Sequence, residues 1–154
     1  MQPDPADVDA VRARIGREPV APFEVVVRDA LGAPAVIRNA PFTVDGRPMP
    51  TRYWLVDRDL VRDVARLEAA GGVKVAEAEV DASALVGAHR AYETERDAVI
   101  PAGWTGPRPF GGVGGTRQGV KCLHAHYAYW LAGGDDPVGA WVHARLHAPV
   151  PTRP

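Results

Sequence analysis

The chain has 154 residues, of which 46% are hydrophobic and 24% are charged, and this composition is typical of one globular domain. Its 18 basic and 19 acidic side chains give a net charge of −1, which excludes a general nucleic-acid-binding surface. The single cysteine, Cys122, excludes an internal disulfide. No apolar run approaches the roughly 20 residues of a membrane-spanning helix, and the first residues lack the pattern of a signal peptide. We therefore expect a soluble, cytoplasmic domain over residues 1–148 and a disordered tail over residues 149–154.

The first third of the chain is predicted to form one helix and then a sheet. Apolar residues at spacings of three and four indicate an amphipathic helix over residues 7–17. Three segments rich in β-branched or aromatic residues follow and are predicted strands, at 23–28, 35–38 and 52–56. The dipeptide Asp45-Gly46 is a turn signal between the second and third of them. The pattern indicates a small antiparallel or mixed sheet.

Helices are predicted to dominate the rest of the chain. Asp57 is expected to cap the first of them, which ends at Gly71-Gly72, and the charges of Glu93 to Asp97 are expected to form a solvated face. A long loop with three prolines and seven glycines interrupts the helices at 101–119. The predicted helices cover residues 57–70, 81–99, 120–132 and a last segment from Asp135 or Asp136 to about His147.

These elements define the expected fold class. We predict an α+β fold with a small antiparallel or mixed sheet in the N-terminal half, packed with about four to five helices. The sequence shows no internal repeat and no domain boundary.

The candidate functional stretch runs from Gly111 to His126. Five glycines in the nine residues 111–119 are costly to order, so we expect unusual backbone angles or a close approach to another group. The loop leads into a predicted helix start, where free N–H groups and the helix dipole favour an anion. A tightly turning surface loop without a ligand is the alternative. The residues expected to contact an anion are Gly112, Gly114, Gly115, Thr116, Arg117 and His124.

Cys122 and His126 are the predicted reactive pair. The helix dipole, Lys121 and Arg117 are each expected to lower the pKa of Cys122 and favour its thiolate. Residues four apart share a helix face, so His126 is the expected base for a Cys122 nucleophile, and Lys121 is a third catalytic candidate. His124 is rotated by about 200° from Cys122 and is expected to face the core, where it can support the site by hydrogen bonding. The alternative for Cys122 is a buried small hydrophobe.

The remaining histidines are weaker candidates. His143 and His147 could complete a four-ligand zinc-type site with Cys122 and His126 if the last two helices pack antiparallel. We expect this second pair to face solvent instead. His89 is expected to be a satisfied surface or interface histidine.

The run Gly112–Arg117 followed by Gly119–His126 resembles the bacterial family named domain of unknown function 501, which is common in actinobacteria. The segments Gly16–Pro19, Pro50–Leu55 and Arg66–Gly72 fit the same family. The family has no established activity. Its genes tend to lie near those for a septum-formation initiator and an exopolyphosphatase, which implies an association with cell division or envelope growth.

The resemblance also implies a metal hypothesis. Members of the family often have two further cysteines, at places that here hold Asp29 (or Ala30) and Asp57. Three such thiolates would suit a metal or iron–sulfur centre. In this chain the implied site would consist of Cys122, His126 and one or both aspartates, with a divalent metal as the cofactor and with hard carboxylates replacing two soft ligands.

Three functions therefore stay open. The first is an enzyme or binding protein for a small anionic molecule, held by Arg117, Lys121 and the loop amides. The second is the metal-binding protein. The third is a non-catalytic interaction module with a protein partner. The sequence names no reaction and no oligomeric state.

Overall fold

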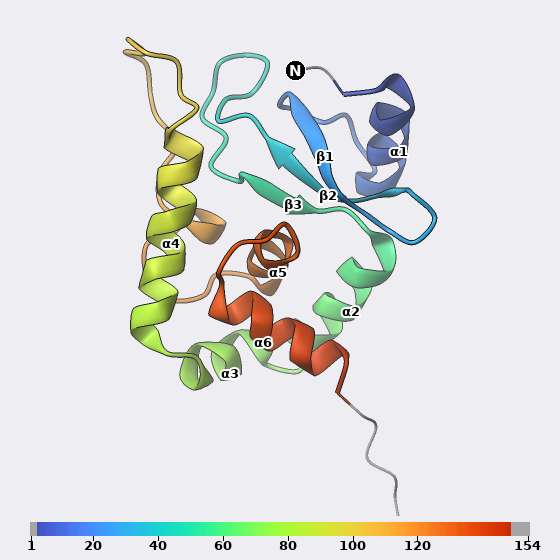
Figure 1. Cartoon of the computed structure of the whole chain (residues 1–154), viewed down its shortest axis with the longest axis vertical. Helices are drawn as coiled ribbons and strands as arrows, with labels where there is room; N and C mark the ends of the chain where they lie inside the picture. The colour runs from blue at the N-terminus through green and yellow to red at the C-terminus, as the bar shows by residue number, and fades with distance from the viewer. Residues whose placement is uncertain (1–2, 149–154) are drawn as a thin grey trace, which may run out of the picture.

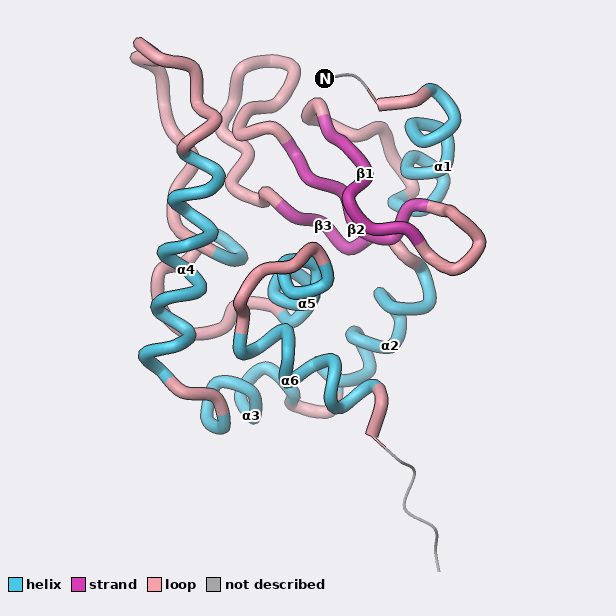
Figure 2. Tube along the Cα trace, viewed as in Figure 1, coloured by secondary structure: helices cyan, strands magenta, loops and turns pink. Residues whose placement is uncertain are grey.

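The computed structural model describes residues 3–148, and the predicted tail at 149–154 lies outside the described residues. A three-stranded sheet occupies the N-terminal half of this part, and helices make up most of the remainder (Figures 1 and 2). The predicted α+β class is confirmed. Among residues 3–148, no helix combines the length and the apolar character that crossing a membrane requires.

The sheet is antiparallel throughout, with the order β1-β2-β3. It consists of β1 (Phe23–Arg28), β2 (Pro34–Asn39) and β3 (Tyr53–Leu55). In the central strand, Ile37 pairs with Val25 on one side and with Trp54 on the other. Of the two sheet types left open by the sequence, the antiparallel one is therefore present.

Helix α1 (Pro5–Ile15) covers one face of the sheet. Its Val11 is fully buried and packs in a cluster with Phe23, Ile37 and Val56. The opposite face of the sheet meets the remaining helices, with α5 directly beneath β3 (Figure 1). The sheet is thus the middle layer between one helix and a helical group.

The helical group follows the sheet in sequence. The predicted N-cap Asp57 is confirmed, since its side chain accepts from the N–H of Leu60 at 3.0 Å. Of the two starts predicted for the last helix, Asp136 is the one present, and its side chain accepts from the N–H of Val138 at 2.9 Å. The helices are α2 (Arg58–Ala69), α3 (Gly72–Glu79), α4 (Ala82–Asp97), α5 (Leu123–Leu131) and α6 (Pro137–Leu146), with a short 3-10 turn, η1, at Val113–Gly115.

Helix α3 is the element that the sequence pattern missed. Gly71-Gly72 was expected to end the preceding helix, and it does, but a new helix begins at once. Gly71 has a φ of 87°, and a Cβ at Gly72 would lie 2.5 Å from the carbonyl oxygen of Leu67. The pair is therefore a sharp corner between two helices rather than the start of a loop.

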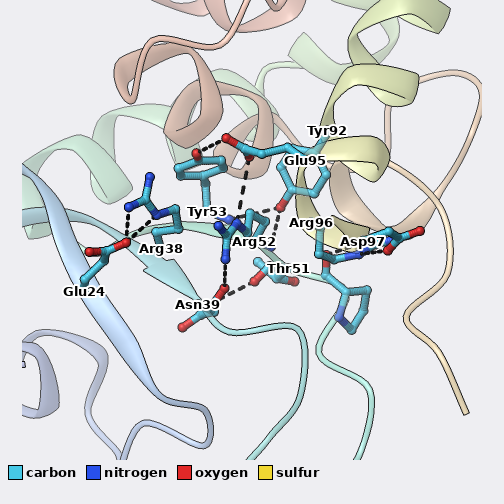
Figure 3. A network of polar contacts seen from close by, with 11 residues as sticks. Glu24, Arg38, Asn39, Thr51, Arg52, Tyr53, Tyr92, Glu95, Arg96 and Asp97 are labelled. Atoms are coloured by element: carbon cyan, nitrogen blue, oxygen red, sulfur yellow. Dashed lines mark hydrogen bonds and ion pairs between the residues drawn. The ribbon is translucent and has the colours of Figure 1, made fainter. Parts of the chain in front are cut away.

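A polar network ties β3 to α4 (Figure 3). The hydroxyl of Tyr92 accepts from the backbone N–H of Tyr53 at 3.1 Å, and the hydroxyl of Tyr53 donates to Glu95 at 2.7 Å. Arg96 is fully buried and donates to the carbonyls of Pro50 and Gly111, at 3.1 and 2.8 Å. The network fixes the start of β3 and the start of the glycine-rich loop against the same helix. The expectation that Glu93 to Asp97 form a solvated face is therefore wrong for Arg96, which is buried.

Candidate functional site

The glycine-rich loop, residues 111–119, is an ordered turn in which the backbone conformation and packing require glycine at several positions. Gly111, Gly114, Gly115 and Gly119 all have positive φ angles, between 68° and 80°. Gly112 has an ordinary φ but lies against α4, where a Cβ would come within 2.6 Å of the Cα of His89. The expectation of unusual angles and a close approach is confirmed, and the group approached is the protein's own helix.

His89 forms hydrogen bonds near both ends of this turn. Its side chain is 1% exposed, Nδ1 accepts from the N–H of Val113 at 3.0 Å, and Nε2 lies 2.8 Å from the carbonyl oxygen of Gly119. Burial is the largest influence on the pKa of His89 and lowers it. The expected satisfied histidine is thus present, but it is in the interior and not at the surface.

The start of α5 is occupied by a carboxylate of the chain itself. Glu68, on α2, accepts from the backbone N–H of Leu123 at 2.9 Å and pairs with Nδ1 of His124 at 2.9 Å. Glu77, on α3, accepts from the N–H of Val120 at 2.8 Å. The anion expected at this helix start is therefore supplied by the chain itself, by the carboxylates of Glu68 and Glu77. These N–H groups are not free to hold an external ligand.

Cys122 precedes the helix instead of lying in its first turn. Its φ and ψ of −148° and 147° are extended, and its Sγ accepts a long hydrogen bond from the N–H of Ala125 at 3.5 Å. Burial raises the pKa of the Cys122 thiol, Glu68 adds to this, and Lys121 opposes it more weakly. The expected thiolate is wrong because desolvation exceeds the effect of the nearby positive charge.

Arg117 lies elsewhere as well. Its guanidinium pairs with Glu93 at 3.2 Å and stacks 4.5 Å from the ring centroid of Phe110. It therefore faces α4 and not the Cys122 thiol, and Arg117 does not lower the pKa of Cys122 as expected.

His124 and His126 exchange their expected positions. His126 is fully buried, and its Nδ1 lies 2.6 Å from Oδ2 of Asp136. Its Nε2 is buried with no hydrogen-bond partner among the described residues. His124 lines a pocket together with Cys122. The reason is the extended cap: because Cys122 is outside the helix, the spacing of four does not place it on the face of His126.

The pocket that contains Cys122 and His124 lies between β3 and the start of α5, and we call it the β3–α5 pocket. Its volume is about 480 Å³. Most of its lining is apolar or aromatic, and the guanidinium of Arg17 stacks 5.2 Å from the Trp54 ring at its edge. Arg17 forms no ion pair with any residue in the range 3–148. The lining residues are Arg17, Val20, Met49, Thr51, Tyr53, Trp54, Leu55, Gly114, Cys122, His124 and Ala125.

A second, more polar hollow lies between α4 and the loop, and we call it the α4 hollow. Its volume is about 750 Å³, and the loop contributes Arg117 and Gln118 to it. The predicted ligand residues are therefore divided. Gly114 and His124 line the β3–α5 pocket, Arg117 lines the α4 hollow, and Gly112 is buried against α4. Gly115 and Thr116 line neither of them.

The residues of the metal hypothesis are not brought together. Within the described part of the chain, no three His, Cys, Asp or Glu side chains are grouped as a metal site would require. Asp29 and Asp57 do converge, at 3.1 and 3.5 Å, but on the guanidinium of Arg14. Cys122 faces the β3–α5 pocket and His126 faces the interior, so the set Cys122, His126 and Asp57 has no common centre.

His143 on α6 and His147 at its C-cap do not join Cys122 either. His147 is exposed, as expected. His143 is half-buried instead: its Nδ1 lies 3.0 Å from the hydroxyl of Tyr127, and its ring centroid lies 4.4 Å from that of Trp130.

Sequence reasoning missed several residues that shape the site. Arg17 is the last residue of the helix predicted over residues 7–17, but it lies after the end of α1, and nothing local signals its place beside Trp54. Tyr53 and Trp54 of β3 line the pocket, and an aromatic strand sequence does not distinguish pocket lining from core. Glu68 and Glu77 look like ordinary helix-surface charges. Only the fold shows that they hold the segment before α5.

The fold and pocket define a small helix-rich α+β domain with a mainly apolar ligand-sized cavity. A family model described as "Protein of unknown function (DUF501)" matches residues 25–144. This match covers most of the chain, and the chain belongs to that family. No curated protein and no solved structure matches the chain.

Proposed function

We propose that the protein binds a small anionic molecule with an apolar body in the β3–α5 pocket. The observation that carries the proposal is the guanidinium of Arg17, which has no ion-pair partner in the described chain and lies over Trp54 at the edge of an apolar cavity. Ligand pockets of roughly 300–1,000 Å³ are usually apolar with a few placed polar groups. This pocket, at about 480 Å³, falls in that range.

The positive charge for the anionic group would come from Arg17 and Lys121. Lys121 is exposed and forms no ion pair among residues 3–148. Its Cβ lies near the pocket wall, since a Cβ at Gly114 would be 3.2 Å away from it. The glycine at this position therefore leaves room for the lysine beside the pocket. Both side chains are exposed, so an anion held by them would keep part of its hydration.

The apolar body of the ligand would lie against the aromatic wall formed by β3. Tyr53 and Trp54 line the pocket, and Met49 adds an adaptable side chain. His124 contributes to the wall, but its Nδ1 is engaged by Glu68 and its Nε2 lies 3.0 Å from the carbonyl oxygen of Val61. This histidine is thus held in place by both nitrogens.

Binding is favoured over nucleophilic catalysis by the state of Cys122. Its raised pKa keeps the thiol protonated near neutral pH, and the expected base, His126, is paired with Asp136 in the interior. Cys122 would then contact the ligand as a neutral, polarizable group.

The proposal is tested by calorimetric titration of the full chain with phenyl phosphate, inorganic phosphate and phenol. We expect saturable binding of phenyl phosphate, weaker binding of the other two, and a loss of about fivefold in affinity for Arg17→Gln, as befits an exposed charge worth ~1 kcal/mol. Arg108→Gln is the matched control, because Arg108 is also exposed but lines neither the pocket nor the hollow. Absence of saturable binding, or equal losses in both variants, would contradict the proposal.

A further inference from the structure

We propose that His89 is a pH-dependent latch: its neutral form holds the glycine-rich loop closed on α4, and its protonated form releases the segment from Val113 to Gly119. The proposal uses a buried titratable side chain that the ligand-binding proposal leaves without a role. Its effect on ligand binding rests on the proposed function, whereas the release of the loop does not.

The hydrogen bonds of His89 require one protonation state. The N–H of Val113 donates to Nδ1, so this nitrogen must carry a lone pair. Nε2 lies 2.8 Å from the carbonyl oxygen of Gly119 and must therefore carry the proton. Only the neutral Nε2–H tautomer satisfies both partners. The two bonds reach the two ends of the turn, so one ring spans the loop.

Protonation removes one bond and creates a conflict. A proton on Nδ1 would point at the N–H of Val113, which is itself a donor, and both would be buried. A shift of the loop toward α4 is blocked, because Gly112 packs so closely on the helix that an added Cβ would lie 2.6 Å from the Cα of His89. Separation of the loop from α4 lets water reach the ring and resolves the conflict.

The charged groups around His89 are mostly paired with one another, so protonation of His89 itself is the event that breaks the latch. His126, from α5, has its ring centroid 5.5 Å away and is paired with Asp136 at the start of α6. Glu93 of α4 is paired with Arg117 of the loop, and the carboxylate of Glu77 on α3 is bound by the Val120 N–H. The charged or titratable groups around the ring are therefore His126, Asp136, Arg90, Glu93, Arg117 and Glu77.

The direction of the pH effect follows from these surroundings. Burial and the charge of His126 lower the pKa of His89, while the Gly119 carbonyl and Asp136 oppose this. A histidine with a lowered folded-state pKa stabilises the closed form fully above its unfolded pKa of about 6.5 and progressively less below it. The loop is thus closed at neutral pH and opens on acidification.

Release of the loop would alter both cavities. Gly114 belongs to the lining of the β3–α5 pocket, and Arg117 and Gln118 belong to that of the α4 hollow. Loss of the His89 bonds loosens the loop backbone at these residues, while Arg96 still holds Gly111 at the beginning of the loop and Glu93 still pairs with the Arg117 side chain. Acid would therefore change the wall of the pocket without unfolding α4.

Amide hydrogen exchange by NMR, on the full chain between pH 7.5 and 5.0, tests the latch. After correction for intrinsic exchange, we expect protection of the Val113 amide to fall at least tenfold while amides of β2 stay protected. His89→Gln should remove this selective pH dependence, because the side-chain amide of glutamine does not titrate. His147→Gln is the matched control and should retain it, since His147 is exposed at the C-cap of α6.

A second measurement uses the wild-type chain and tests the latch even if the His89→Gln variant does not fold. The ring ¹⁵N shifts of His89 in the wild-type chain should report the Nε2–H tautomer at pH 7.5 and protonation over the range in which Val113 loses protection. Opening of the loop while His89 stays neutral would overturn the proposal. So would constant Val113 protection across the range, or loss of protection in β2 at the same pH. These outcomes need no ligand, so failure of the ligand-binding proposal is recognised separately.

Discussion

At the scale of single residues, Cys122 shows how one backbone conformation sets the chemistry of a site. The apolar spacing from Val120 onward predicts a helix that includes Cys122, but the helix begins one residue after it. Cysteine is not among the usual N-cap residues, so the sequence gives no signal for this boundary. The later start of the helix turns Cys122 toward His124 and the pocket, and leaves His126 to the interior.

The reactivity of Cys122 is the corresponding prediction. Because burial raises the pKa of this thiol, its alkylation by iodoacetamide at pH 7 should be slower than that of glutathione and should accelerate only in alkaline solution. The assay is unambiguous, since the chain has one cysteine. Alkylation at pH 7 as fast as glutathione's would demonstrate an activated thiolate and restore the nucleophile hypothesis.

His89 and Arg96 show a second limit of local sequence reasoning. Both lie on α4 at positions that look exposed, and both are buried because the distant loop covers that side of the helix. A helical pattern describes which residues share a face. It does not describe which later segment folds over that face, so these two anchors could be found only in the structure.

At the scale of elements, the sequence predicted strands and most helices from periodicity and caps. Strand β1 has the predicted limits, and Asp57 caps its helix as expected. Helix α3 was missed because a glycine pair is a strong stop signal whether a loop or another helix follows. The glycine-rich loop was recognised, but the group that it approaches could not be deduced from composition.

The close contact between the loop and α4 gives a prediction for Gly112. Gly112→Ala should destabilise the protein by about 2 kcal/mol, because the added methyl overlaps α4 and no strain in φ is involved. Gly87→Ala is the matched control on α4: no atom lies within 4 Å of the added Cβ, so it should be neutral or stabilising by up to about 1 kcal/mol. Chemical denaturation measures both. Equal effects of the two substitutions would show that the loop does not pack on α4 as described.

At the scale of the whole molecule, the proposed site depends on segments that are far apart in the chain. Arg17 follows α1, Trp54 belongs to β3, and Cys122 precedes α5. The family match begins at residue 25, so Arg17 lies before the matched segment. Composition and periodicity predicted an α+β chain of this size, but a pocket assembled by tertiary packing leaves no local pattern. For this reason the candidate stretch contained only part of the pocket.

The central claim is that a small anion with an apolar body binds between β3 and α5. Its most direct test is NMR titration of the ¹⁵N-labelled full chain with phenyl phosphate at pH 7.5, where the loop is closed. We expect saturable shifts of the Trp54 indole N–H and of the Gly114 and Cys122 amides. Saturable shifts confined to Arg117, Gln118 and α4 would place the site in the α4 hollow and contradict the claim, as would the absence of any saturable shift.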